Sequence, residues 1–96
     1  DPAIVFTSMG CSGCHAIAGV SSAPIGPPLD GIAIRAASRV SGLSAEEYIR
    51  ESITEPGSFV VKDCPSGDCA PVMPSLRSAM TDAEFEGLVA YLLTLK

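Results

Sequence analysis

The first apolar face of the chain lies close to its beginning. Val5, Phe6 and Met9 recur at the spacing of an α-helix, so a helix is predicted over residues 2–9, with Pro2 at its first position. We expect Asp1 to cap this helix, because its carboxylate can accept hydrogen bonds from the backbone N–H groups that a helix start leaves unpaired. The chain is therefore expected to open with a short amphipathic helix.

Two later helices are marked by capping boxes, in which a hydroxyl residue is followed three positions later by a glutamate. Ser44 and Glu47 form the first such pair, and Thr81 and Glu84 form the second. The first of these helices is expected to end at a Glu-Pro-Gly sequence, and the second to run to about Leu95. Their expected buried faces are Tyr48, Ile49 and Ile53 in the first helix and Phe85, Leu88, Val89, Leu92 and Leu95 in the second.

The segments between these helices are rich in glycine, proline and serine. Residues 19–31 and 57–75 are predicted to be long loops without secondary structure, and residues 32–37 a short helical turn. No stretch alternates between apolar and polar positions as a strand would, and no segment is repeated. We therefore predict a single all-α domain over residues 1–96. Loops of this length in a small domain usually wrap a ligand or carry function.

The composition indicates that side chains alone do not fill the interior. The chain of 96 residues contains no tryptophan, three phenylalanines and two tyrosines, although 47% of its residues are hydrophobic. A domain this small usually needs disulfides, a metal or a large cofactor to be stable. A cofactor that forms part of the core would explain this composition.

The charge distribution disfavours several classes of partner. The formal net charge is −5, and all of the acidic excess lies in residues 41–96. With two lysines and no basic run, the chain is not expected to bind nucleic acid or anionic lipid. No apolar run is long enough to predict a membrane span. No signal peptide is visible, so we interpret the sequence as a mature or excised domain.

The sequence CSGCH contains the clearest candidates for a redox, metal or cofactor site, namely Cys11, Cys14 and His15. A thioredoxin-like dithiol would need a βαβ context, which the pattern does not provide. A zinc site could add Cys64 and Cys69, but those two are separated by four residues and His15 would be left over. Covalent attachment of a c-type haem uses the whole motif, because both thiols bond the haem and the histidine reaches its iron. We favour one haem c attached through Cys11 and Cys14, with zinc binding and a structural disulfide as alternatives.

The second iron ligand cannot be another histidine, because His15 is the only one in the chain. Met9 is too close in the sequence to reach the opposite face of the haem. Met80 directly precedes an expected N-cap and is expected to pack on Phe85 as a hydrophobic staple. Met73 lies in a loop and is followed by a proline that stiffens the chain beside it. We favour Met73, with Met80 and an open sixth position as alternatives.

Four further motifs resemble the class I monohaem cytochrome c family. They are Phe6, five positions before the first motif cysteine, GPPLDG at residues 26–31, VMPSL at 72–76 and LVAYLLTL at 88–95. The resemblance covers nearly the whole chain and implies a small fold of three main helices, with long loops wrapped around one covalently bound haem. His/Met ligation favours electron transfer over enzymatic activity, because a fully ligated iron does not readily bind oxygen or peroxide.

The resemblance also implies roles for residues around the haem. The carbonyl of Pro27 is expected to accept the ring N–H of His15, and Arg35 is expected to lie near a haem propionate. Tyr48 and Phe59 are expected to line the haem pocket.

Cys64 and Cys69 are expected to form a disulfide, because four cysteines in a short chain are typical of an oxidising compartment. Such a bond would make the segment that leads to Met73 more rigid. A periplasmic or otherwise extracytoplasmic location is therefore predicted, with a tether to the membrane through a segment outside this sequence as an alternative.

The predicted function is single-electron transfer between redox partners of a respiratory chain, such as a respiratory complex or a terminal oxidase. We expect a monomer that is not an enzyme. The first alternative is a cytochrome c domain of a larger oxidase or quinol-oxidising complex. A haem sensor or enzyme and a zinc module without haem are weaker alternatives.

Overall fold

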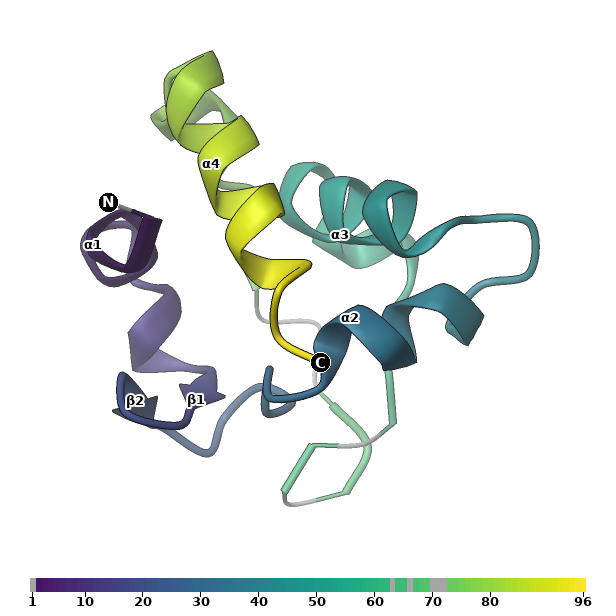
Figure 1. The fold of residues 1–96 in the computed structure, drawn as a ribbon. Helices are drawn as coiled ribbons and strands as arrows, with labels where there is room; N and C mark the ends of the chain where they lie inside the picture. Colours follow the sequence, from purple (N-terminus) through teal and green to yellow (C-terminus); the bar gives the residue numbers. More distant parts are fainter. Residues whose placement is uncertain (1, 63, 66, 70–72) are drawn as a thin grey trace.

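The structure is a computed structural model that describes residues 2–62, 64–65, 67–69 and 73–96. Within these residues the α-helices are α1 (Pro2–Ser8), α2 (Ile32–Arg35), α3 (Ala45–Thr54) and α4 (Asp82–Leu92), and the strands are β1 (Ala16–Ile17) and β2 (Ser21–Ser22) (Figure 1). Short 3₁₀ turns lie at Cys11–Gly13, Ala36–Ser38, Pro56–Ser58 and Arg77–Ala79. Helix α4 lies between α1 and α3 and contacts both of them (Figure 1).

The three long helices predicted from the sequence are present as α1, α3 and α4, and the predicted short turn is α2 with the 3₁₀ turn that follows it. Helix α4 ends at Leu92, earlier than predicted, because the chain then turns onto α2. The N–H of Leu95 donates to the Leu92 carbonyl at 3.1 Å, and the Leu95 carbonyl accepts from Ala33 at 3.0 Å. The expected cap of the first helix, Asp1, lies outside the described residues.

The two long loops contain some secondary structure, so this part of the all-α prediction was wrong. Strands β1 and β2 pair in antiparallel register, with Ala16 opposite Ser22 and Ile17 opposite Ser21. In the second loop, an isolated bridge joins residues 64 and 67. Strands of two residues are too short to produce an alternating pattern, which is why none was predicted.

Both predicted capping boxes are confirmed. The Ser44 hydroxyl accepts from the Glu47 N–H at 3.1 Å, and the Glu47 carboxylate accepts from the Ser44 N–H at 2.8 Å. Thr81 and Glu84 exchange the same two hydrogen bonds at the same distances. Each box satisfies backbone donors that the helix itself leaves unpaired, and this fixes where α3 and α4 begin.

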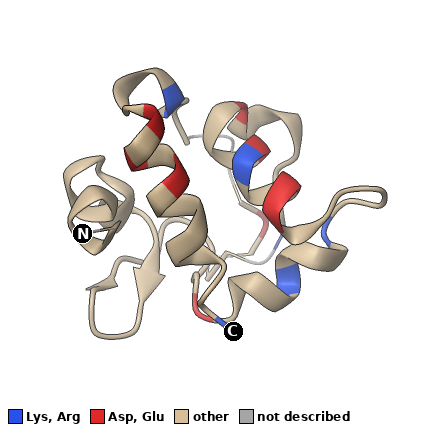
Figure 2. Cartoon of the chain, turned by 45° about the horizontal axis from the view of Figure 1, so that its top comes forward, with Lys and Arg blue, Asp and Glu red and all other residues tan. Residues whose placement is uncertain are grey.

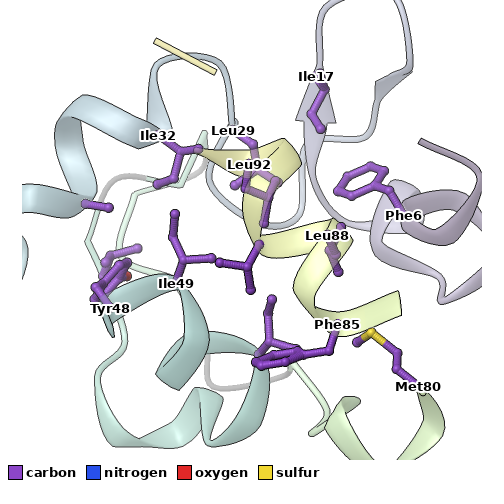
Figure 3. Close-up of a cluster of buried hydrophobic side chains, with 14 residues drawn as sticks. Phe6, Ile17, Leu29, Ile32, Tyr48, Ile49, Met80, Phe85, Leu88 and Leu92 are labelled. Carbon is purple, nitrogen blue, oxygen red and sulfur yellow. The ribbon is translucent and has the colours of Figure 1, made fainter. Parts of the chain in front are cut away.

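The core is a cluster of buried apolar side chains that surrounds α4 (Figure 3). Phe6 of α1 is 1% exposed, and Leu88 and Val89 of α4 are each 2% exposed. The predicted buried face of α3 is also present and consists of Tyr48, Ile49 and Ile53. Met80 lies beside Phe85 in this cluster, the position predicted for a hydrophobic staple (Figure 3).

Arg50 links α3 to α4 through charged contacts at the surface. Its guanidinium donates to both carboxylate oxygens of Glu86 at 2.6 Å and to Glu46 at 3.0 Å. It also lies 5.5 Å from the centre of the Phe85 ring, a cation–π contact. The exposed fractions of the two glutamate side chains are 54% and 58%, so solvent screens these pairs and each one contributes little.

We expect the free energy of unfolding to fall as the pH drops below 4.5, the ordinary pKa of a glutamate. The hydrogen bonds from Arg50 hold the pKa of Glu86 below that value, and the Ser44 backbone N–H does the same for Glu47. Because both pKa values are lowered by folding, the stability they contribute is present above the unfolded-state pKa and is lost as the pH falls through the folded-state value. Denaturant titrations between neutral pH and pH about 3 measure this loss.

The variant Glu86→Gln should lose less stability over the same pH range than the parent protein. Glu51→Gln is the matched control, because the Glu51 carboxylate forms no hydrogen bond or ion pair with the described residues. If both variants follow the parent protein, the contact between Arg50 and Glu86 is not a source of the pH dependence.

Candidate cofactor site

The CSGCH motif folds into a tight turn directly after α1. Gly10 has a φ of +82°, in the left-handed region that glycine adopts without strain, and it turns the chain into the 3₁₀ turn Cys11–Gly13. The N–H groups of Cys14 and His15 then donate to the Cys11 carbonyl at 3.1 and 2.9 Å. Both thiols are half-buried, and burial raises the pKa of the Cys11 thiol. The turn therefore brings two thiols and an imidazole together in one compact structure.

These three side chains line a cavity of about 290 Å³. A smaller cavity of about 70 Å³ shares much of the same wall. The residues that line both are Cys11, His15, Pro27, Tyr48, Ser52 and Met73. No lysine, arginine, aspartate or glutamate of the described part of the chain lines the larger cavity, whereas Arg39 lines the smaller one. The site is thus an apolar space with a few sulfur and nitrogen groups at its wall.

The imidazole of His15 has a defined orientation. Its Nδ1 lies 2.8 Å from the carbonyl oxygen of Pro27. Because a carbonyl oxygen can only accept a hydrogen bond, Nδ1 is the nitrogen that donates, and Nε2 keeps a free lone pair for a metal. The carbonyl of His15 is also held, since it accepts from the Ser21 hydroxyl at 2.5 Å. A neutral imidazole fixed through one nitrogen is the usual arrangement of a metal-binding histidine.

Gly26 packs directly against this imidazole, a contact that the sequence analysis did not predict. A Cβ atom at residue 26 would lie 2.7 Å from Cε1 and 2.8 Å from Nδ1 of His15. The N–H of Gly26 also donates to the Cys14 carbonyl at 2.7 Å. The glycine therefore allows the loop to approach the ring closely enough for the next residue, Pro27, to accept its proton. In the sequence, only the position of Gly26 at the start of the GPPLDG motif could have identified it as a residue of the site.

We expect Gly26→Ala to destabilise the protein by about 1–3 kcal/mol, the usual cost of forcing extra atoms into a packed site. The added methyl must displace either the ring of His15 or the loop that carries Pro27. Denaturant titration measures the loss, and the visible spectrum of the haem-loaded protein reports the displaced histidine.

Gly87→Ala is the matched control for this substitution. Gly87 lies inside α4, and a Cβ there would meet no atom within 4 Å. Because alanine is the better helix former, this variant should gain about 0.5–1 kcal/mol. An unchanged spectrum and stability in Gly26→Ala would show that the close contact with His15 does not constrain the site.

The three methionines occupy different environments. Met73 lines both cavities, and Met9 lines only the larger one. Met80 lines neither cavity and is 6% exposed in the hydrophobic core. The valine that precedes Met73 in the VMPSL motif, Val72, lies outside the described residues.

The remaining predicted pocket residues divide into two groups. Tyr48 and Phe59 both line the larger cavity, and their rings meet edge to face with centroids 6.1 Å apart. Arg35 lines neither cavity, because its guanidinium donates to the backbone carbonyls of Pro28 and Asp30. The structure therefore brings the two aromatic residues to the site and places Arg35 beside the loop that carries Pro27.

Cys64 and Cys69 lie at disulfide distance, with their Cα atoms 5.2 Å apart, and both line the larger cavity. A disulfide between them would remove two of the four sulfur ligands that the zinc alternative requires. Among the described residues, which include every cysteine and the histidine, no group of three or more His, Cys, Asp or Glu side chains is placed to hold a metal ion. The described residues therefore give the zinc alternative no support.

Ser52 is a second residue of the site that the sequence analysis missed. It lines both cavities and lies on α3 four residues after Tyr48. This spacing places the two side chains on one face of the helix, so helical periodicity could have identified it.

The residues present fit a haem attached through thioether bonds. The cavity is apolar, two thiols lie at its wall, and His15 has a nitrogen available for iron.

Among the described helices, none combines the length and the apolar character needed to cross a bilayer.

Comparison with known proteins agrees with this assignment. The family model described as cytochrome c matches residues 3–96. A search of individual curated proteins found no match. Members of the family carry covalently bound haem c, exchange electrons with redox partners, generally are not enzymes and are typically extracytoplasmic. Since the family model spans all but two residues, the chain belongs to the cytochrome c family.

Proposed function

We propose that this protein transfers single electrons between redox partners of a respiratory chain through one haem, attached by Cys11 and Cys14 and ligated by His15 and Met73. The observation that carries the proposal is the convergence of these four side chains on one apolar cavity. Met73 is favoured because it lines both cavities, whereas Met80 is buried in the core.

The chain contributes the environment in which the haem supplies its one-electron chemistry. The Pro27 carbonyl holds a proton at Nδ1 of His15, so Nε2 is presented as the donor. The thioether of Met73 is a weak donor that favours the reduced state and so raises the reduction potential. The apolar wall excludes water, and two ligands from the chain leave no open position for a substrate. These properties suit electron transfer better than catalysis.

The partner is proposed to dock against the part of the cavity wall that residues 2–29 contribute. Residues 2–29 contain no lysine, arginine, aspartate or glutamate. Acidic residues are instead gathered on α3 and α4 (Figure 2). Ile25 and Phe59, both of which line the cavity, are 54% and 41% exposed. A partner with an apolar face would therefore fit this surface better than one with a strongly charged face.

The proposed location is the periplasm or another extracytoplasmic compartment. The approach of Cys64 and Cys69 to disulfide distance supports it, because such bonds persist in oxidising compartments.

Optical and kinetic measurements on the haem-loaded protein test the proposed function. We expect a reversible one-electron titration, a far-red band from sulfur ligation in the oxidised form, and no rapid binding of carbon monoxide by the reduced form. Electron exchange with an anionic and a cationic small complex of matched driving force should differ by less than about tenfold, because none of the described residues that line the larger cavity is charged. Rapid carbon monoxide binding would instead indicate a sensor or an enzyme.

A further inference from the structure

The loop that carries Pro27 is held from two sides. From α2, the guanidinium of Arg35 donates from Nη1 to the Asp30 carbonyl at 2.6 Å and from Nη2 to the Pro28 carbonyl at 2.5 Å. From the other side, the Asp30 carboxylate accepts from the N–H of Ala18 at 3.0 and 3.2 Å. The segment 28–30 is therefore fixed both to α2 and to the chain that follows His15.

Gly31 makes the approach of Arg35 possible. It has a φ of +78°, and a Cβ at this residue would lie 2.9 Å from Nη1 of Arg35. A larger residue would be strained by this φ, and the guanidinium would have to shift to make room for its Cβ. The glycine thus allows the chain to turn at this residue and leaves space for the guanidinium of Arg35 beside the loop.

The orientation of the Pro27 carbonyl depends on the carbonyl that Arg35 holds. The peptide between Pro27 and Pro28 is planar, and the ring of Pro28 fixes its φ. Between the two carbonyls, only rotation about the Cα–C bond of Pro28 remains, so holding the Pro28 carbonyl restricts the orientation of the Pro27 carbonyl. That carbonyl is the group that accepts the proton of His15 Nδ1.

We propose that Arg35 is a positioning residue for His15, which acts by holding the loop whose Pro27 carbonyl orients the imidazole. The inference rests on the proposed function, since it treats His15 as the iron ligand, and it adds to the role at a propionate that the sequence predicts for Arg35. Loss of the two hydrogen bonds from Arg35 to the loop loosens the hydrogen bond between Nδ1 of His15 and the Pro27 carbonyl. The imidazole then becomes a weaker donor, and the reduction potential rises.

The single histidine of the chain allows this hydrogen bond to be observed directly. In the haem-loaded protein labelled with ¹⁵N-histidine, exchange of the Nδ1 proton of His15 with solvent is followed by NMR. Arg35→Gln should accelerate this exchange by about tenfold and raise the reduction potential. Arg35→Lys should behave like Arg35→Gln, because a lysine keeps the charge but cannot bridge two carbonyls as a guanidinium does. Arg35→Lys is the more conservative change, so it tests the same inference if the Arg35→Gln variant folds poorly.

Arg50→Gln is the control, because Arg50 also forms several charged hydrogen bonds but makes them with Glu46 and Glu86, outside the site. Exchange that is no faster in either Arg35 variant than in this control, at equal global stability, would overturn the inference. An unchanged exchange rate with an altered pH dependence of the potential would also overturn it and would leave contact with a propionate as the role of Arg35. If the His15 signal shows no shift between oxidised and reduced protein, the proposed ligation fails, whereas the effect of Arg35 on proton exchange is still measured.

Discussion

Replacing both Cys11 and Cys14 by serine is expected to abolish covalent attachment of the haem and, with it, the stable fold. Acidified acetone should then extract the pigment, which the parent protein retains. The physical reason is the cavity of about 290 Å³ that the chain alone does not fill. At ~24 cal/mol per Å³, leaving such a space without its occupant costs on the order of 7 kcal/mol. This is comparable to the whole stability of a small domain, about 5–15 kcal/mol.

Far-ultraviolet circular dichroism and solvent extraction measure the two parts of this result. The matched control replaces Cys64 and Cys69 by serine, which also removes two sulfur atoms from the cavity wall but no predicted link to the haem. That variant should keep its pigment through extraction. Pigment that stays bound to the Cys11 and Cys14 double variant would contradict the predicted attachment.

The second large effect is expected for Met73→Ala. Loss of the thioether should remove the far-red absorption band of sulfur ligation and allow carbon monoxide to bind the reduced protein. The reduction potential should fall on the order of 0.2 V, a fraction of the ~0.8 V range over which axial ligands set haem potentials. Absorption spectroscopy and a redox titration measure both changes.

Met80→Ala separates ligation from packing. Because Met80 is 6% exposed beside Phe85, its truncation should cost about 2–5 kcal/mol of stability and leave the far-red band in place. Met9→Ala should also keep the band. If the band disappears in the Met80 variant and persists in the Met73 variant, the ligand assignment is wrong.

The sequence was sufficient to predict features that depend on neighbours along the chain. The capping boxes at Ser44 and Thr81 involve residues three positions apart, and the structure confirms both. The buried face of α3 follows from helical periodicity in the same way. The CSGCH motif lies in one turn of chain, so haem attachment could be predicted for it before any tertiary structure was known.

Features that depend on loop positions could not be predicted in this way. The sequence favoured Met73 but kept Met80 as an alternative ligand, and the fold places Met73 at the cavities and Met80 in the core. The two-residue strands were missed because they are too short to form a pattern.

By itself, the sequence was sufficient to predict the three long helices, the CSGCH turn as a haem attachment motif and a cofactor in the interior, because each prediction rests on local spacing or on composition. Only the tertiary structure decided that Gly26 lies against His15 and that Arg35 reaches the carbonyls of Pro28 and Asp30. The loop after the motif has no periodicity, so the direction of its backbone is set by hydrogen bonds to distant residues such as Ala18. Such contacts exist only once the chain has closed on itself.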